Sequence, residues 1–407
     1  MPQSLTNFDA ALKDDYGPGL RESINNSNPV WTEATRNDED IVGRQAVWSV
    51  HTSRSTSTGA RGELSALPSA DRQRYSQAKE NLAYLYHTIK VSGPAKQLTR
   101  NDSGAFVRAL EAEIDGAERD LKNDCARQAF GDVVTIASTN YTGALAKVTN
   151  VATNTLTLAA PNGNAITASE MRYFFVNESV DVINGSTAAV RGTSTISSIN
   201  RAAGTITLAA APGGSAANDY VARSGSFGAE MFGLRYLVNN TGVFANIDPS
   251  VVPTWASVLV GSTSTPISEV LIDQAQEGVE TDGDGNTPTL LLGEHAQRRK
   301  LASILQAQKR YDGREVTLKA GWQGLQVARG TLVCDRFCPQ QDMFAIYTKE
   351  FTRFVGLDFT WDEDDGKVLF KALDGSDAIE ARFKSYQNLV TTNRNSHARI
   401  QVSVPVF

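Results

Sequence analysis

The residues best suited to chemistry lie in two acidic segments, and the first resembles a calcium loop. In "TDGDGNTPTLLLGE" (281–294), Asp282, Asp284 and Asn286 match the first three oxygen-ligand positions of such a loop. The match then fails, because the glycine position holds Thr287 and the position of the bidentate acid holds Gly293. We therefore favour an acidic, glycine-rich turn over a calcium site.

The second acidic segment, "WDEDDGK" (361–367), places four acids in a row from Asp362 to Asp365. A run of like charges that ends at a glycine is typical of a solvated hairpin turn. We predict no metal site in the chain, although the sequence leaves open whether a cation binds at 282–286 or at 362–365.

The usual catalytic motifs are absent from the sequence. It contains no phosphate-binding loop, dinucleotide-binding turn, nucleophile elbow or zinc-binding histidine pair. The four histidines stand singly, and the three cysteines are too few for a disulfide scaffold, so we interpret the cysteines as reduced structural thiols. These seven residues are His51, His87, His295 and His397, and Cys125, Cys334 and Cys338. We predict no catalytic residue, no cofactor-binding residue and no enzymatic activity.

Composition limits the class of protein further. The 407 residues are 41% hydrophobic and 21% charged, which is ordinary globular composition, and the net charge is −6. A negative chain is not a dedicated nucleic-acid binder, and the basic stretch 298–300 is better read as a solvated helix face. Residues 1–30 lack the order of a secretory signal, and no apolar run reaches the roughly 18 residues of a membrane span. We therefore expect a protein made and kept inside a cell, with no membrane partner.

The first third of the chain predicts an arm, an excursion and a long helix. Residues 1–40 are polar and irregular, and residues 41–91 leave the body and return, with a flexible tip at 51–64. Over 103–130 apolar residues recur at spacings of three and four, which predicts one long amphipathic helix. Its stripe comprises Phe106, Leu110, Ile114, Ala117, Leu121 and Cys125.

From about 131 to 225 charge nearly vanishes, and short alternating runs are separated by Gly, Asn or Pro. This pattern predicts a small all-β barrel or sandwich inserted into the main fold over 142–224. Two similar phrases, "NTLTLAAPNG" (154–163) and "GTITLAAAPGG" (204–214), are interpreted as equivalent hairpins within it. After 225 we expect helices at 266–278, capped by Thr265, and at 294–310, followed by strands at 367–373, 378–386 and 398–407.

This order of elements resembles the major capsid proteins of tailed bacteriophages, the Hong Kong 97-type fold. The segment "GAEMFGLRYLVNNTGVFANIDPSVVPTW" (228–255) is similar to one that many such proteins carry after an inserted domain. Within it stand Ile247, Asp248, Pro249, Ser250, Pro253 and Trp255. Residues 286–293 are similar to the start of the axial-domain helix, and 385–400 to the closing peripheral strand.

The resemblance implies an α+β capsid fold with an N-terminal arm, an extended loop, a spine helix, and peripheral and axial domains. The expected divisions are 1–40 (arm), 41–91 (extended loop), 92–141 (peripheral domain with spine helix), 142–224 (inserted β domain), 225–345 (axial domain and connections) and 346–407 (C-terminal peripheral strands). Some relatives crosslink through a lysine of the extended loop. Residues 41–78 contain no lysine and the first is Lys79, so we do not expect that reaction here.

The resemblance also implies a function, which is to self-assemble as hexamers and pentamers into the icosahedral shell that encloses phage DNA. Expected partners are other copies of the chain, scaffolding, portal and decoration proteins, and packaged double-stranded DNA through weak, non-specific contact. The expected location is the virion, after assembly in the bacterial host cytoplasm. Two alternatives remain open: an encapsulin-like bacterial nanocompartment shell, and an adhesin-like or carbohydrate-binding β-domain protein.

Overall fold

The computed structural model describes residues 28–92, 103–283, 285–307, 315–317, 323–363, 369–371 and 377–405. Most of the predicted arm, residues 1–27, therefore lies outside the described residues. Its described part is helix α3 (Pro29–Glu33), which begins after Asn28, and strand β1 (Thr35–Asn37). The Asn28 side chain caps α3 by accepting a hydrogen bond from the amide of Val30.

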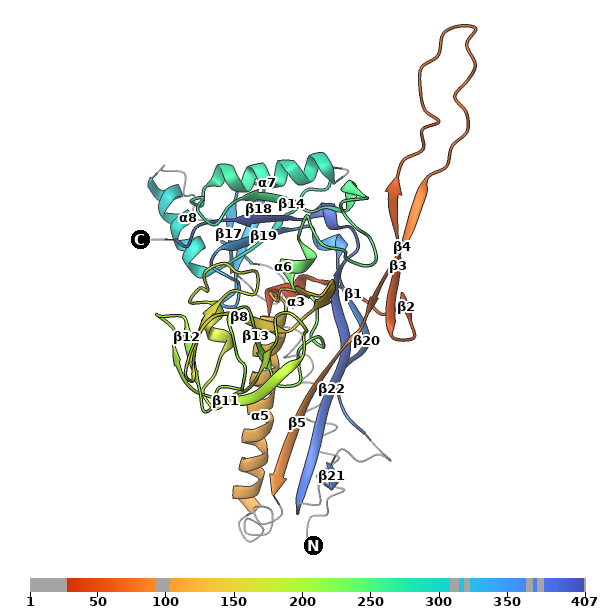
Figure 1. Ribbon diagram of the computed structural model, residues 1–407. Coiled ribbons are helices and arrows are strands. Elements are labelled where there is room, and N and C mark those ends of the chain that lie inside the picture. The colour runs from red at the N-terminus through yellow and green to blue at the C-terminus, as the bar shows by residue number, and fades with distance from the viewer. Residues whose placement is uncertain are drawn as a thin grey trace.

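A five-stranded sheet and a long helix form one half of the body (Figure 1). The sheet has the order β1-β20-β22-β21, and β5 pairs with β22 beyond this path. The remaining strands are β5 (Ala83–Ser92), β20 (Phe351–Trp361), β21 (Leu369–Lys371) and β22 (Ala378–Thr391). The helix α5 (Ser103–Gln128) lies beside β5 and is the predicted spine helix. At 1.5 Å per residue it is about 39 Å long.

The predicted apolar stripe of α5 faces the core where its side chains are described. Ile114, Ala117, Leu121 and Cys125 are all buried, while the side chains of Phe106 and Leu110 lie outside the described part. Beside this stripe, Glu118 and Lys122 form an ion pair one turn apart. Periodicity alone was therefore sufficient to orient this helix.

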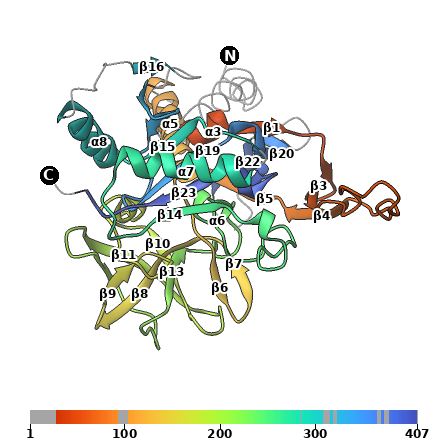
Figure 2. The same ribbon diagram turned by 90° about the horizontal axis from the view of Figure 1, so that it is seen from above.

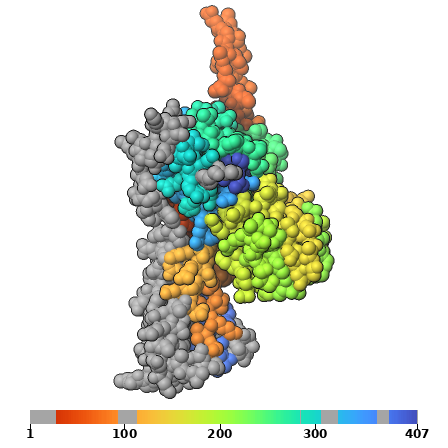
Figure 3. Space-filling view, turned by 90° about the vertical axis from the view of Figure 1, so that its left-hand side faces the viewer, coloured from red at the N-terminus to blue at the C-terminus, as the bar shows by residue number. Residues whose placement is uncertain are grey.

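A projecting hairpin lies before this sheet in the chain. Strands β3 (Gln45–Ser53) and β4 (Arg74–Asn81) pair from Gln45↔Asn81 to Ser53↔Arg74, and β2 (Ile41–Val42) joins β3. The tip, 54–73, contains no strand and stands clear of the body (Figures 1 and 3). One correction to the predicted loop, 41–91, follows: β5 leaves the hairpin and pairs with β22 over ten residues, because alternate residues such as Leu85 and Ile89 are buried in the body.

The inserted β domain is a closed six-stranded barrel with the order β10-β11-β12-β9-β8-β13, which confirms the predicted inserted barrel or sandwich. Its strands are β8 (Ala144–Ala152), β9 (Thr155–Ala159), β10 (Ser179–Ile183), β11 (Val190–Asn200), β12 (Thr205–Leu208) and β13 (Tyr220–Arg223). The two repeated phrases supply β9 and β12, which pair directly through Leu156↔Ile206. Both of these side chains are fully buried in the barrel. A separate hairpin, β6 (Val134–Ile136) and β7 (Thr139–Tyr141), precedes it.

The other half of the body is a seven-stranded sheet with the order β14-β23-β19-β15-β18-β17-β16. Its strands are β14 (Val258–Gly261), β15 (Leu290–Gly293), β16 (Glu315–Thr317), β17 (Gln323–Val327), β18 (Gly330–Cys334), β19 (Asp342–Ile346) and β23 (Ala398–Gln401). Helices α7 (Glu269–Asp282) and α8 (His295–Ala307) belong to this half. Short helical turns elsewhere are α6 (Leu234–Leu237), η2 (Glu170–Tyr173), η3 (Pro253–Trp255), η5 (Thr348–Glu350) and η6 (Arg394–Ser396).

Two sequence-based expectations for this half need correction. Helix α7 begins after Ser268, whose hydroxyl accepts from the Leu271 amide, whereas Thr265 instead accepts from the Ser262 amide in the preceding turn. Strand β23, expected among the peripheral strands of 346–407, lies in the seven-stranded sheet because it pairs with both β14 and β19. Residues 308–310 of the predicted second helix lie outside the described residues.

The hairpin and the barrel leave the body in different directions, as the view from above shows (Figure 2). Among the described helices, none combines the length and the apolar character that crossing a bilayer requires. The hairpin and the barrel are thus two separate projections from the body (Figures 1 and 2). The contacts at the base of each projection determine its direction.

Candidate functional site: the junctions that hold the hairpin and the barrel

The two acidic segments do not form a metal site among the residues that the structure describes, which contain no cluster of three or more potential ligands. Asp282 is the last residue of α7, Asp284 lies outside the described part, and the Asn286 amide donates to the Ser396 hydroxyl at 3.0 Å. In the second segment Asp362 accepts from Lys384, while Asp364 and Asp365 lie outside the described part. That neither place binds a cation stays a prediction.

The described histidines and cysteines form no cluster of three or more potential metal ligands, and His397, Cys125 and Cys338 are buried. His397 is fully buried, and its Nδ1 accepts from the Tyr347 amide at 3.2 Å; burial lowers its pKa to about 3. Burial also raises the pKa of the Cys334 thiol to about 12 and raises those of Cys125 and Cys338. A thiol with a raised pKa is a poor nucleophile, as expected for a structural cysteine.

The base of the hairpin is anchored to the body by Trp48 of β3. Its ring stacks on Phe354 of β20, with centroids 5.7 Å apart and planes 24° apart, and its Nε1 donates to the Thr392 carbonyl at 3.2 Å. The Asn388 side chain of β22 donates to the Asn81 carbonyl at 2.7 Å. An aromatic ring that is both packed and hydrogen-bonded fixes position and orientation together.

A half-buried carboxyl, that of Glu80, lies beside this anchor. The Ala245 amide donates to Glu80 Oε1 at 2.8 Å, and burial raises the pKa of Glu80 to about 7. Ala245 lies in the segment that resembled capsid proteins, between Phe244 and Trp255, whose rings stack with centroids 6.0 Å apart. Phe244 and Ala245 therefore form the surface against which the base of the hairpin packs, and we call this surface the floor of the hairpin.

Arg394 supports the floor of the hairpin, because its guanidinium lies over the Phe244 ring, 5.7 Å from the centroid. It is fully buried, and its guanidinium donates to the carbonyls of Tyr236, Leu237, Thr241 and Gly242 at 2.7–3.2 Å. Burial lowers its pKa to about 10. One side chain thereby binds four backbone carbonyls and links the buried end of α6 to the exposed turn that follows it.

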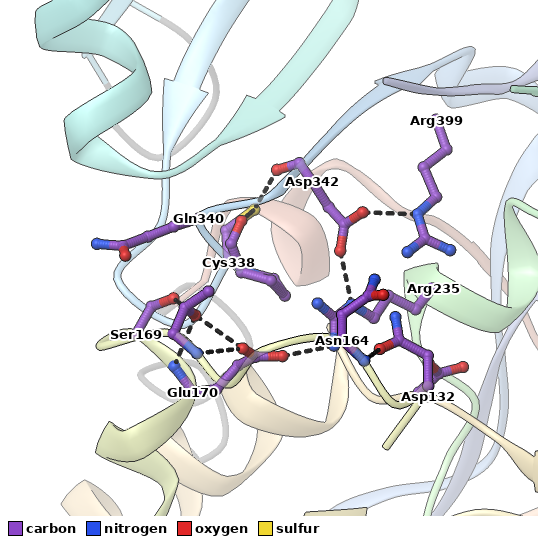
Figure 4. Close-up of polar contacts among 12 residues, drawn as sticks. Asp132, Asn164, Ser169, Glu170, Arg235, Cys338, Gln340, Asp342 and Arg399 are labelled. Atoms are coloured by element: carbon purple, nitrogen blue, oxygen red, sulfur yellow. Dashed lines mark hydrogen bonds and ion pairs between the residues drawn. The ribbon is translucent and has the colours of Figure 1, made fainter. Parts of the chain in front are cut away.

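The barrel is joined to the seven-stranded sheet by a buried chain of charges (Figure 4). Arg235 of α6 donates to Glu170 Oε1 at 2.6 Å and to Asp342 Oδ2 at 2.7 Å, and Arg399 of β23 donates to Asp342 Oδ1 at 2.8 Å. Each of the four side chains is at most 6% exposed. Burial opposes ionisation of Asp342, but Arg399 and Arg235 still hold its pKa below the ordinary value. We call these four residues the charge chain.

Further contacts connect the barrel to the rest of the body. The Tyr173 hydroxyl donates to the Phe337 carbonyl at 2.7 Å. Arg223 of β13 forms an ion pair with Asp124 of the spine helix, and Arg127 of that helix binds Glu230 at 2.6 Å. The barrel thus contacts both halves of the body through specific polar groups and cannot swing freely on its two connections.

Sequence analysis did not find these junction residues. Glu170 and Arg235 are 65 positions apart, and Arg235 and Asp342 are 107 apart. No local spacing connects them. The available signal was the low number of charged residues over 142–224, which makes each one, such as Glu170 or Arg223, a candidate for a specific contact.

Substituting Arg235→Met should destabilise the protein by about 3–5 kcal/mol, because it leaves the carboxylate of Glu170 buried without its cation. Arg329→Met is the matched control: Arg329 contacts three carboxylates where Arg235 contacts two, but its side chain is 44% exposed, so we expect a loss below about 1 kcal/mol. Urea unfolding gives both values. Equal losses in the two variants would contradict the claim that the buried charge chain contributes more to the free energy of unfolding than the exposed ion pairs of Arg329 do.

Glu80→Gln should remove a pH dependence of stability. A carboxyl whose pKa rises from 4.5 to about 7 on folding stabilises the protein below pH 4.5, and this contribution is lost as pH rises to about 7. Above pH 7 the variant should therefore be more stable than the parent by about 2 kcal/mol, and the gap should close toward pH 4.5. Thermal unfolding across this range measures it. The same substitution at exposed Glu39 is the control, and a pH-independent gap at Glu80 would refute the expectation.

Comparison with known proteins gives similarity in structure but not in sequence. No protein-family model matches the chain, and no curated protein matches it either. Among solved structures, the cyanophage A-1(L) capsid asymmetric unit has a TM-score of 0.52 at 12% identity, covering 96% of this chain and 94% of that one.

Two other solved structures are similar at lower scores. One, from Mycobacterium phage Bobi, has a TM-score of 0.46 at 9% identity over 92% of this chain and 90% of its own. The other is the SrpI encapsulin complex of Synechococcus elongatus, with a TM-score of 0.43 at 10% identity over 93% and 90%. We base the fold assignment on the cyanophage chain. Its likeness over nearly the whole length confirms the predicted fold, that of a phage capsid protein of the Hong Kong 97 type, here with an inserted barrel.

Proposed function

We propose that this chain is a major capsid protein, which self-assembles as hexamers and pentamers into an icosahedral shell around phage DNA. The observation that carries the proposal is the exposed hairpin tip, where Leu64 is 100% and Leu67 85% exposed. Apolar side chains held so far from the body gain burial only against another molecule. The capsid fold supports another copy of the same chain as that molecule, since closed symmetric assembly covers such surfaces.

The junctions supply what assembly of this kind requires. Trp48 and Asn388 fix the base of the hairpin, so that its tip reaches over an adjacent copy at a defined angle. The spine helix α5 stiffens the body, and the region around α7 and α8 gathers near the axis of each hexamer or pentamer. The barrel, fixed by the charge chain, projects from the shell or contacts a neighbour. Obligate interfaces of this type exceed about 2,000 Å² in total.

The proposed divisions follow the expected boundaries, with the two corrections above. The extended loop is the hairpin, β5 belongs to the peripheral sheet, and β23 belongs to the axial sheet. In this proposal the role is structural and non-catalytic, in the virion, after assembly in the host cytoplasm. Scaffolding, portal and decoration proteins are the proposed partners, and packaged DNA makes only weak, non-specific contact with a chain of net charge −6.

Replacing residues 54–73 by the two-residue turn Asn-Gly should abolish shell assembly while leaving the body folded. The tip is held together by bonds such as those of Thr56 to Asp71, and it stands clear of the body (Figure 1), so we expect the body to remain folded. We expect the thermal midpoint to change by no more than about 2 °C, the lower end of the shift that 1 kcal/mol causes in a domain of about 150–250 residues. Electron microscopy and sedimentation measure assembly.

A milder pair of variants separates the effect of apolar contact from the effect of length. The double substitution Leu64→Ser with Leu67→Ser should weaken assembly, whereas Val251→Ser, at a residue that is 77% exposed elsewhere, should not. Unchanged shells from the tip-deleted chain would contradict the proposal. A parent chain that stays monomeric even with its scaffold partner would contradict it as well. Shells that contain cargo protein would instead favour the encapsulin-like alternative.

A further inference from the structure

A groove at one end of the barrel has a composition that the shell function does not explain. It encloses about 580 Å³, within the range of roughly 300–1,000 Å³ typical of ligand sites. It lies between the end of β11 and the segment that precedes β10. Its lining residues are Phe174, Phe175, Val176, Ile199, Asn200 and Arg201.

One wall of the groove is apolar and open to solvent. Phe174 is fully buried beneath it, whereas Phe175 is 44% exposed and Val176 is 53% exposed. Ile199 packs partly against the barrel core and continues the wall. Exposed aromatic and branched side chains that adjoin each other around a hollow are typical of a binding surface.

The polar rim of the groove offers side-chain donors without carboxylate acceptors. The Asn200 Oδ1 already accepts from the Ala203 amide at 3.1 Å, which leaves the Asn200 Nδ2 donors for a ligand. Arg201 is exposed and, among the described residues, has no ion pair or side-chain hydrogen bond. Glu178 follows Phe175 and Val176 closely in the chain, but it is only 14% exposed and its two oxygens are occupied: Oε1 pairs with Arg223 at 2.8 Å and Oε2 accepts from the Phe175 amide at 3.2 Å. The rim is therefore a positively charged set of donors.

We infer that this groove binds an acidic peptide segment of a partner protein, with an apolar side chain against Phe175 and Val176 and a carboxylate at Arg201. Charge complementarity favours this occupant, since a guanidinium without a carboxylate beside it attracts an anionic group. A neutral sugar fits less well, because it carries no charge to pair with Arg201, the one charged side chain of the lining. The inference does not rest on shell assembly.

A library of immobilised 12-residue peptides of random sequence, probed with the labelled full-length chain, tests the inference. Bound peptides should be enriched in Asp and Glu adjacent to Leu, Ile, Phe, Tyr or Trp. Arg201→Glu should weaken binding of the selected peptides about tenfold, because attraction becomes repulsion. Phe175→Ser should weaken it by a similar factor through lost apolar contact.

The control is Lys147→Glu, at a cation on β8 outside the groove lining, which should leave peptide binding unchanged. Thermal unfolding of each variant shows whether the barrel remains folded, and sedimentation shows whether assembly is unaffected. Three outcomes would overturn the inference: no acidic enrichment, equal binding by Arg201→Glu, or binding of maltohexaose in place of peptides. Loss of assembly in the groove variants without loss of peptide binding would instead assign the groove to a second copy of the chain.

Discussion

The position of the barrel depends on the buried charge chain, in which Arg235 links Glu170 of the inserted domain to Asp342 of the seven-stranded sheet. Burying charges costs several kcal/mol per ion unless each one is paired with good geometry. The native state therefore tolerates one arrangement of barrel and sheet, and any rotation between them would separate buried opposite charges. An inserted domain with only two backbone connections is thereby fixed to its host at a defined angle.

The direction of the hairpin is fixed mainly by aromatic packing and not by ion pairs. Stacking of Trp48 on Phe354, and the floor held by Arg394, determine the direction in which β3 and β4 leave the body. Apolar and aromatic contacts position the hairpin, and ion pairs position the barrel. Both projections are rigid at their bases and exposed at their ends, a combination suited to repeated contact between copies in a closed shell.

Sequence patterns were sufficient where the interactions are local. The spacing of Ile114, Ala117, Leu121 and Cys125 predicted the buried face of the long helix, and alternation in "TLTL" and "TITL" predicted two strands of one small β domain. Local patterns could not show that these two strands pair with each other, or that β5 leaves the hairpin for the sheet of β22. Both facts depend on contacts between distant segments, as does the charge chain, whose members span 229 positions from Glu170 to Arg399.

The most direct test of this account is a double-mutant cycle on Glu170 and Arg235, measured as free energies of unfolding in urea. The variants are Glu170→Gln, Arg235→Met and the two combined. If the charge chain fixes the barrel to the sheet, the double variant should be more stable than the sum of the single losses implies, by at least about 1.5 kcal/mol. Additivity within about 0.5 kcal/mol would show that the two residues act independently and would contradict the account.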